Sequence, residues 1–200
     1  MRKVIAVVWM TLDGVVQGPI SPDEDRSGGF ENGGWHAPHT RDETFGRATI
    51  DAIAGASGFL LGRGTYEEFA AHWPNASPEE QPMAEPLNRL PKYVASTTLR
   101  APLAWNDATL LEGDVASAVA ALAQEGDGYL LAIGSPELVR TLLGAGLLDD
   151  LRLMIDPVVV GGGKRLFTGD GALHTLSLVE STVTTTGAIM VTFRPNEEGK

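Results

Sequence analysis

An apolar run, a glycine and a helix start follow one another in Tyr129-Leu130-Leu131-Ala132-Ile133-Gly134-Ser135-Pro136-Glu137-Leu138. The apolar run is typical of a strand that is buried on both faces, as in a parallel sheet. Ser135, Pro136 and Glu137 then give three helix-start signals: an N-cap residue, a proline in the first turn and an acidic side chain. The stretch therefore predicts a strand, a tight turn and a helix that ends near Gly144.

A second junction of the same kind lies at Leu60-Leu61-Gly62-Arg63-Gly64-Thr65-Tyr66. In both junctions a helix begins directly after a glycine turn, so free N–H groups and the helix dipole favour an anion there. Ligands of open α/β sheets collect at this carboxyl edge. Ordinary turn chemistry explains either junction alone, with Ser135 capping its own helix. The two together, with Arg63 at one of them, favour a phosphate-bearing ligand.

The rest of the chain alternates between strand and helix patterns. We expect strands at 4–10, 57–62, 92–96, 108–112 and 151–160, and helices at 40–54, 65–73, 83–89 and 114–124. The tail predicts an antiparallel pair, 176–185 and 188–193, joined by a turn at Thr186-Gly187. Strands that alternate with helices imply an α/β fold with a mostly parallel sheet. No composition shift divides residues 1–200, so we expect a single domain.

The charge balance limits the class of partner. Fifteen Lys and Arg stand against 26 Asp and Glu, a formal net charge of −11, which argues against nucleic acid and anionic membranes as main partners. Cysteine is absent, which excludes disulfides, thiolate zinc sites and cysteine nucleophiles. No apolar run approaches the roughly 20 residues of a membrane span. Without a signal-peptide pattern, we expect a cytoplasmic protein.

Several polar segments have ordinary explanations. Gly161-Gly162-Gly163-Lys164-Arg165 lacks the upstream glycine and the Ser or Thr of a phosphate-binding loop, and predicts a flexible loop at a strand end. His36 and His39 have the spacing of metal ligands, but a solvated loop without metal is favoured. Asp23-Glu24-Asp25 lacks the pattern of a calcium loop and predicts a solvated charge run. The glycine-rich segment 13–36 predicts a lid that a ligand orders.

Six segments, taken in order, carry a resemblance that spans nearly the whole chain. They are Thr11-Leu12-Asp13-Gly14-Val15, Leu61-Gly62-Arg63-Gly64-Thr65-Tyr66-Glu67, Lys92-Tyr93-Val94-Ala95-Ser96-Thr97-Thr98-Leu99, Gly134-Ser135-Pro136-Glu137-Leu138, 147–151 and 157–167. The ordered set resembles the dihydrofolate reductase-like superfamily. Within it, the set is most similar to the branch named after the C-terminal reductase domain of the riboflavin-biosynthesis deaminase–reductase, RibD. The resemblance implies a three-layer α/β/α fold and a stand-alone domain of the reductase type.

The resemblance also implies NADPH as the cofactor. In that family the turns that match 62–65 and 134–135 hold the cofactor phosphates, the strand end that matches 96–98 holds the adenosine, and the segment after the first strand lies beside the nicotinamide. The cofactor-binding residues carried over are Thr11, Leu12, Gly14, Gly62, Arg63, Thr65, Ser96, Thr97, Gly134, Ser135, Glu137 and Leu138. Thr97 stands where an arginine is common, so NADH stays open beside NADPH.

The catalytic acid of the folate enzymes has no carboxylate at its place here. In those relatives a carboxylate follows a Trp and a Pro at fixed spacing and protonates a pteridine nitrogen. Trp35 and Pro38 keep the spacing, but the acid position is Thr40, and a hydroxyl is a poor general acid. The catalytic candidates are therefore Asp13, beside the nicotinamide, and Asp42, just beyond Thr40. The alternative for Asp42 is that it opens its helix.

Two functions follow from these residues. The first is an NADPH-dependent reductase of a small heterocyclic or ribosylamino-pyrimidine-type substrate, resembling 5-amino-6-(5-phosphoribosylamino)uracil reductase. The alternative is a non-catalytic nucleotide-binding or pterin- or flavin-binding protein on the same fold, which Thr40 favours. Relatives of this branch pair, and the expected strand at 151–160 with the C-terminal pair offers an edge to a second copy. We therefore expect a homodimer.

Overall fold

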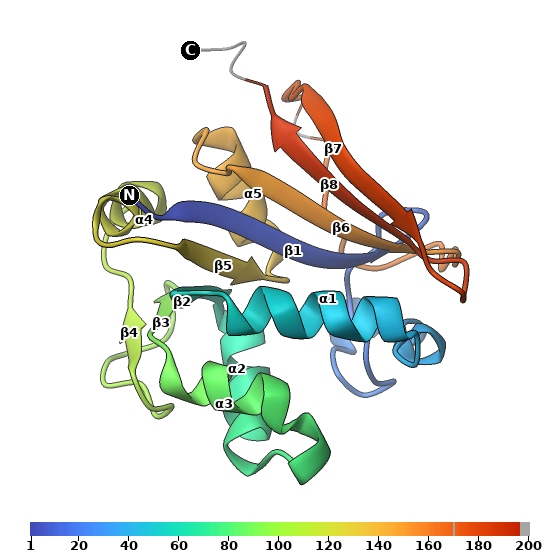
Figure 1. Ribbon diagram of the computed structural model, residues 1–200, viewed down its shortest axis with the longest axis horizontal. Helices are drawn as coiled ribbons and strands as arrows, with labels where there is room; N and C mark the ends of the chain where they lie inside the picture. Colours follow the sequence, from blue (N-terminus) through green and yellow to red (C-terminus); the bar gives the residue numbers. More distant parts are fainter. Residues whose placement is uncertain (170, 197–200) are drawn as a thin grey trace.

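The computed structural model describes residues 1–169 and 171–196, so residues 170 and 197–200 of the predicted domain 1–200 lie outside the described residues. The described residues form one eight-stranded sheet in the order β4-β3-β2-β5-β1-β6-β8-β7 (Figure 1). The strands are β1 (Lys3–Thr11), β2 (Gly58–Gly62), β3 (Lys92–Ala95), β4 (Ala108–Leu110), β5 (Tyr129–Ile133), β6 (Asp150–Asp156), β7 (Leu176–Val183) and β8 (Ile189–Pro195). All neighbours from β4 to β6 are parallel, and the β7–β8 hairpin joins β6 antiparallel. The predicted α/β sheet with an antiparallel C-terminal pair is confirmed.

Helices cover both faces of the sheet. On one face lie α1 (Glu43–Ala54), α2 (Arg63–His72) and α3 (Gln81–Arg89), and on the other lie α4 (Val115–Gln124) and α5 (Pro136–Gly144). Figure 1 shows α1 in front of the sheet and α5 behind it, which confirms the three-layer arrangement. Short 3-10 turns lie at Ser27–Gly29, Ala37–His39, Trp73–Asn75 and Pro78–Glu80. Within the described residues, no helix has the length and apolar character needed to cross a membrane.

The central strand β1 is buried on both faces. Side chains alternate along a strand, so Ile5 and Val7 pack with the α1 layer, whereas Val4, Ala6 and Val8 pack with the α5 layer. All five side chains are at most 3% exposed. Burial on both faces is the reason why this segment is a continuous apolar run.

The turn after β5 lies where the direction of the chain connections changes. The helices that follow β1 and β2 lie on the α1 face, whereas α5, which follows β5 between them, lies on the opposite face. Such a change opens a crevice at the carboxyl ends of the strands, where ligands of open α/β sheets bind. β1 continues past this point, because its last pair with β5 is Val7–Ile133 but its last pair with β6 is Thr11–Asp156. The carboxyl edge is therefore stepped, with β1 and β6 extending beyond β5.

The strand expected at 151–160 is shorter than predicted. β6 ends at Asp156, because Pro157 has no N–H to donate to a sheet. β6 also lies between β1 and β8, so of the edge predicted from 151–160 with the C-terminal pair, the part on 151–160 is wrong and the C-terminal pair forms the edge. The outer strand at this side of the sheet is β7.

Candidate functional site

The two glycine turns meet at the carboxyl edge of the sheet, where such a crevice is expected. Gly134 and Ser135 both have a left-handed backbone, with φ of 56° and 54°, and the Ser135 side chain lies against the end of β2. Its hydroxyl oxygen accepts a hydrogen bond from the N–H of Gly62 at 2.8 Å and lies 2.8 Å from Oγ1 of Thr65. The interpretation that Ser135 caps its own helix is wrong, because its side chain makes no capping bond to α5.

Gly62 has no room for a side chain. A Cβ at this position would lie 2.9 Å from Oγ of Ser135 and 3.0 Å from its Cβ. In α2 and α5, which are fully described, no side chain caps the first N–H groups. Two helix N-termini are thus open side by side at the crevice, an arrangement that suits an anion with two charged groups such as a pyrophosphate.

The other residues predicted at these turns differ in their position. Arg63 is the first residue of α2 and donates to Glu67 at 2.9 Å, with both side chains about half exposed. A surface ion pair of this kind is weak, so a phosphate can compete for Arg63. Glu137 is exposed in the first turn of α5. Leu138 is buried in the core of the α5 layer, so only its backbone can serve a ligand.

The turn after β3, where adenosine is expected, is held by Ser96. Its Oγ accepts hydrogen bonds from the N–H groups of Thr98 and Leu99, at 3.1 and 3.0 Å. Thr97 is exposed. The guanidinium of Arg100 donates to the Leu99 carbonyl at 3.0 Å, so a cation lies on this turn although Thr97 is uncharged. Arg100 was missing from the sequence prediction, and the available signal was a basic residue three positions after Thr97.

The carboxylate of Asp13 is fully engaged by the protein. It accepts hydrogen bonds from Oγ1 of Thr11 at 2.6 Å and from the N–H of Gly161 at 3.0 Å, and it pairs with Arg165 at 3.2 Å. The Thr11 hydroxyl above all, and then the N–H groups of Val160 and Gly161, lower the pKa of Asp13 to about 2, although burial opposes them. Asp13 is thus ionised near neutral pH and joins the chain after β1 to the loop after β6.

The neighbours of Asp13 have separate roles. Thr11 is completely buried and Leu12 is exposed. Gly14 has a φ of 82°, which glycine adopts without strain. Leu12 is therefore the side chain of this segment that is open to a ligand.

Asp42 is engaged in a similar way. Its Oδ1 accepts from the N–H of Phe45 at 3.0 Å and its Oδ2 accepts from the N–H of Thr185 at 2.8 Å and from the Thr185 hydroxyl. These groups, with the Thr185 hydroxyl first, lower the pKa of Asp42. The alternative role of Asp42, opening its helix, is therefore its observed role. The exposed Thr40 donates its hydroxyl to the carbonyl of Ala37 at 2.9 Å.

The long segment 13–36 is tied to the loop after β6. The Lys164 ammonium pairs with Asp25 at 2.6 Å, and the Lys164 N–H donates to Oε1 of Gln17 at 3.0 Å. Although burial opposes them, hydrogen bonds from Lys164 and Ser27 lower the pKa of Asp25 to about 2. The prediction of a solvated charge run at 23–25 is therefore wrong for Asp25, and Lys164 holds the segment in place.

His36 and His39 are buried, so the prediction of a solvated loop is wrong. His36 is 0% exposed, and its Nδ1 lies 2.7 Å from Oδ2 of Asp156, the last residue of β6. The ring centroid of His36 lies 4.6 Å from that of Phe45 and 6.3 Å from that of Trp9. In the part of the chain that the structure describes, no three His, Asp or Glu side chains group as metal ligands would.

Buried side-chain atoms without a hydrogen-bond partner gather around this pair. Within residues 1–169 and 171–196 they are Trp9 Nε1, His36 Nε2, His39 Nδ1, Thr49 Oγ1 and Asp156 Oδ1. Trp9 and Asp156 lie on the same face of neighbouring strands, since Trp9 pairs with Met154, two residues before Asp156. Each unpaired buried group costs on the order of 1–3 kcal/mol, and native proteins hold few of them. Their clustering marks a site that ligand or water completes.

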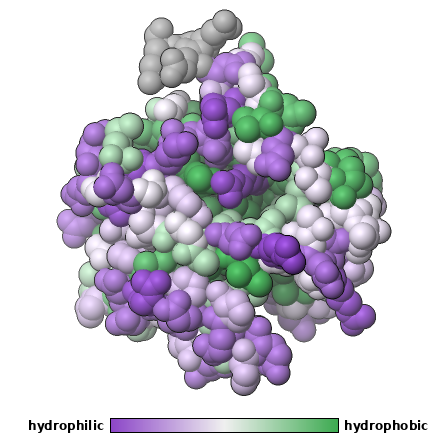
Figure 2. Space-filling model, viewed as in Figure 1, coloured by the Kyte–Doolittle hydropathy of each residue, from purple (hydrophilic) through white to green (hydrophobic). Residues whose placement is uncertain are grey.

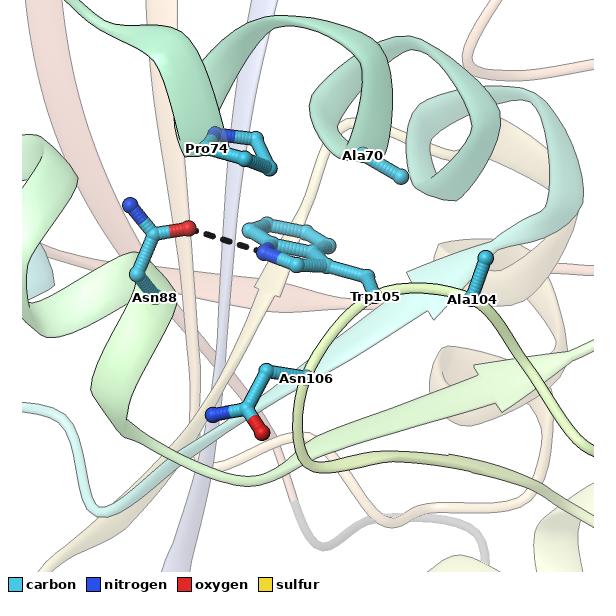
Figure 3. Close-up of a pocket in the computed structure, with 6 residues that line it drawn as sticks. All are labelled: Ala70, Pro74, Asn88, Ala104, Trp105 and Asn106. Carbon is cyan, nitrogen blue, oxygen red and sulfur yellow. Dashed lines mark hydrogen bonds between the residues drawn. The ribbon is translucent and has the colours of Figure 1, made fainter.

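Two cavities lie near the sheet. A small one of about 10 Å³ lies between β1, β5 and α1, with Trp9 and Thr49 in its wall. A larger one of about 450 Å³ lies near the amino ends of β3 and β4, between α2, α3 and the loop before β4 (Figure 3). Two polar side chains that line the larger cavity are paired with each other, since Trp105 donates to Oδ1 of Asn88 at 2.8 Å, and the nearby buried Lys92 lies 4.7 Å from the Trp105 ring and donates to backbone carbonyls. The crevice at the carboxyl edge is therefore the stronger candidate site.

The described residues have a dihydrofolate reductase-like fold, with two glycine turns joined at the carboxyl edge of the sheet. The chain belongs to the RibD C-terminal domain family, whose family model matches residues 2–190. The uncharacterized protein YyaP of Bacillus subtilis is 25% identical over 98% of this chain and 96% of its own length.

Solved structures share the fold. A protein of Shewanella sp. PV-4 with a proposed role in riboflavin biosynthesis has a TM-score of 0.70 and 19% identity, over 98% of this chain and 99% of that chain. A Thermotoga maritima deaminase and 5-amino-6-(5-phosphoribosylamino)uracil reductase has a TM-score of 0.62 and 14% identity, over 98% of this chain and 57% of that chain. Dihydrofolate reductase of Enterococcus faecalis, solved with NADP(H), has a TM-score of 0.59 and 15% identity, over 98% and 97% of the two chains.

Proposed function

We propose that this protein is an NADPH-dependent reductase of a small heterocyclic or ribosylamino-pyrimidine-type substrate. The observation that carries the proposal is the hydrogen bond from the Gly62 N–H to the Ser135 hydroxyl, which joins two helix N-termini in the crevice. Membership of the RibD C-terminal domain family supports an oxidoreductase. The reductase activity in the name of the Thermotoga protein supports the pyrimidine substrate class.

The residues of the crevice fit the phosphate groups of a dinucleotide. Gly62 and Gly134 let a pyrophosphate approach the backbone, and Arg63 supplies a charge at the mouth of α2. Arg100 lies on the Ser96 turn, where it offers the 2′-phosphate of NADPH the cation that Thr97 lacks. A bound reduced nicotinamide supplies hydride chemistry. Arg100 therefore favours NADPH over NADH.

A specific observation favours the alternative, a protein that binds a nucleotide, pterin or flavin without turnover. The two carboxylates that the sequence singled out, Asp13 and Asp42, have lowered pKa values and protein partners. Neither is a suitable general acid, because a proton donor near neutral pH needs a pKa near that pH. Without another proton source, the crevice would bind but not reduce.

Thermal unfolding with NADPH, with NADH and without ligand tests the cofactor. A site that is filled at 100 times its dissociation constant stabilises the folded state by about 2.7 kcal/mol. We expect this stabilisation with NADPH and a smaller one with NADH. Oxidation of NADPH in the presence of pteridine and ribosylamino-pyrimidine compounds then tests the reaction. Stabilisation without oxidation by any of them would support the binding protein, and the absence of stabilisation would contradict both functions.

The proposed assembly is a homodimer that covers β7. This outer strand exposes Leu178, Val179 and Val183, at 58%, 51% and 69%, and Figure 2 shows apolar surface over the C-terminal hairpin, at the upper right. Unpaired edge strands with apolar side chains favour association with another chain. Light scattering at micromolar concentration should give about twice the 21.2 kDa of one chain. A mass of one chain would contradict the dimer.

A further inference from the structure

The pair of His36 and Asp156 is an unusual feature for a protein core. Its side chains are 1% and 0% exposed, and Nδ1 of His36 lies 2.7 Å from Oδ2 of Asp156. Replacement of a buried ion pair by apolar side chains is often neutral or stabilising, so such a pair is not explained by stability alone. Each partner also has a second polar atom, His36 Nε2 and Asp156 Oδ1, without a hydrogen bond. Each side chain of the pair therefore has a polar atom available for a hydrogen bond with a third group.

The partner of Nδ1 decides which nitrogen of His36 can exchange a proton. The Asp156 carboxylate has only lone pairs to offer, so the proton of the short contact belongs to Nδ1. Nε2, which has no hydrogen-bond partner, is then the nitrogen that remains for another group. A carboxylate on Nδ1 also stabilises the charged imidazolium. This arrangement makes Nε2 a proton donor with a fixed direction.

The residues around the His36 ring are mainly aromatic, and the nearby carboxylates have hydrogen-bond donors of their own. Trp9 of β1, Phe45 of α1 and the preceding Trp35 are aromatic, and only His39, with ring centroids 6.3 Å apart, titrates among the ring neighbours. The carboxylates of Asp42, at the start of α1, and Asp13, after β1, already accept hydrogen bonds from other residues. Asp42 at the start of α1 accepts from Phe45 and Thr185, and Thr11, opposite Asp156 in the sheet, donates to Asp13.

The unpaired atoms lie beside the place where the reacting part of a dinucleotide would reach. Asp156 lies two strands away from β5 and four residues further along, since Ile133 pairs with Val7 and Asp156 pairs with Thr11, so it is roughly 16 Å from the end of β5. The cavity that β1, β5 and α1 line, with Trp9 and Thr49 in its wall, is about 10 Å³, which is room for about one water with about three hydrogen bonds. One water is too small to serve all five atoms. A ring with a polar edge offers several partners at once, and the site must open to admit it.

We propose that His36 donates a proton through Nε2 to a ring nitrogen or imine nitrogen of the substrate, and that Asp156 is the positioning residue that orients it. This inference rests on the proposed reductase function and deepens it, because it identifies the substrate as a planar heterocycle with a C=N bond. A bound NADPH would supply the hydride for the carbon of that bond. As the π electron pair moves to nitrogen, His36 would deliver its Nε2 proton there, so that one hydride and one proton are added across the C=N bond and solvent protonates His36 again.

Access to the pair requires a movement of the chain that buries it. Ala37, Pro38 and Thr40, which directly follow His36 in the sequence, are exposed. Displacement of a short surface segment during binding is a common way to admit a substrate and then exclude water. The buried position of His36 in the free protein is therefore compatible with substrate access.

Nitrogen NMR of the histidine side chains in the full chain tests the proton without cofactor or substrate. Neutral His36 should carry its proton on Nδ1, and Asp156→Asn should weaken this preference, because an amide can donate to Nδ1 as well as accept from it. A neutral form with the proton on Nε2 would overturn the proposal.

Kinetics with the heterocycle that oxidises NADPH fastest in the wild type complete the test. In His36→Gln, kcat should fall on the order of 100-fold or more, as expected for a lost general acid, with NADPH affinity within about twofold. The control is His72→Gln, an exposed histidine paired with Glu80 at 2.7 Å, which should keep the wild-type rate. In Asp156→Asn the decline in rate with rising pH should move to lower pH, which a purely structural role would not produce.

The outcomes separate this inference from the proposed function. A wild type that neither binds nor oxidises NADPH contradicts the reductase function and the inference with it. A wild type that turns over while folded His36→Gln retains its kcat contradicts the inference alone. If His36→Gln does not fold, the pH profile and the NMR titration of Asp156→Asn decide, because asparagine keeps the shape of the side chain.

Discussion

The two ends of the carboxyl edge differ in how their polar groups are paired. At β2 and β5, the Gly62 N–H and the hydroxyls of Ser135 and Thr65 form one connected set. Five buried side-chain atoms at the β1 and β6 end lack a hydrogen-bond partner among the described residues. They belong to Trp9, the His36 segment, α1 and Asp156. The side chains of the first end are paired within the protein, with the backbone N–H groups of two helix N-termini left open, whereas buried side-chain atoms of the second end lack a partner.

This difference indicates a division of labour along the crevice. Paired turns hold their geometry before a ligand arrives, so little ordering is needed to bind the phosphates. Unpaired buried groups raise the free energy of the empty site, and a ligand that pairs them gains what they cost. A ring without matching polar atoms leaves them unpaired and is rejected. The β2–β5 end is thus suited to the phosphate groups that nucleotides share, and the β1–β6 end distinguishes between substrate rings by their polar atoms.

The largest expected effect comes from a charge at the paired end. Arg63→Ala should weaken NADPH binding by about 1.5–3 kcal/mol, roughly 10- to 100-fold, because hydrogen bonds to charged groups are worth this much. The matched control is Arg89→Ala, since Arg89 forms the same kind of exposed ion pair, 2.7 Å from Glu85 on α3. Calorimetric titration measures both. Equal affinities of the two variants would contradict the phosphate role of Arg63.

The close approach of the two turns is tested by adding one methyl group. Gly62→Ala should destabilise the protein by about 1–3 kcal/mol, the usual range for overpacking, because the new Cβ meets Ser135 at 2.9 Å. Gly64→Ala, one residue into α2, has no atom within 4 Å of its Cβ and should stabilise by about 0.5–1 kcal/mol. Urea unfolding compares the two. A neutral Gly62→Ala would show that the turns are not in tight contact.

A pair of tryptophan variants compares a satisfied N–H with an unsatisfied one. Trp105→Phe leaves Oδ1 of Asn88 without its donor, whereas Trp9→Phe removes an Nε1 that has no partner. Both lose similar ring volume, so Trp105→Phe should be more destabilising by about 1–3 kcal/mol, the cost of an unpaired buried group. Chemical unfolding at one pH gives the difference. Equal losses would mean that water already satisfies Trp9.

The smallest effect concerns pH and the long segment 13–36. Burial first, and then the charge of Glu24, raise the pKa of Glu68 on α2 from 4.5 to about 7. The folded pKa of Glu68 lies above its unfolded pKa. The stability that protonated Glu68 contributes beside Glu24 is therefore present below about pH 4.5 and is lost as pH rises to 7. Proteolysis between residues 19 and 34 should therefore be faster at pH 8 than at pH 5.

Two further digests complete that experiment. The Glu68→Gln variant should lose the dependence on pH, and Glu67→Gln, the adjacent position, should keep it. A wild type with equal cleavage at both pH values, after correction for the protease, would contradict the link. Saturating NADPH and substrate should slow cleavage if the segment closes as a lid, and equal rates would show that it is not one.

Local patterns were sufficient to predict most of the fold. A short stretch such as 129–138 carries the signals of a strand buried on both faces and of a helix start, and the structure has β5 and the start of α5 there. The error at 151–160 has a local cause as well. Val158, Val159 and Val160 have the composition of a strand, but Pro157 before them has no N–H for the sheet.

The candidate site was predictable only in part. Glycine turns carry their own signal, and the structure brings Gly62 and Gly134 together, although the hydrogen bond that joins them was not foreseen. Asp42 is held by a partner 143 residues away, and His36 by one 120 residues away. Partners so distant in sequence come together only in the tertiary structure, so a pattern cannot show whether a polar residue is solvated, engaged or buried and unpaired.

A crystal structure of the protein with NADPH tests the central claim most directly. The pyrophosphate should lie on the turns at Gly62 and Gly134, the 2′-phosphate near Arg100, and the nicotinamide beside Trp9, with the unpaired atoms of His36 and Asp156 on its far side. A cofactor bound at the Trp105 cavity, or with its phosphates away from both glycine turns, would contradict the account.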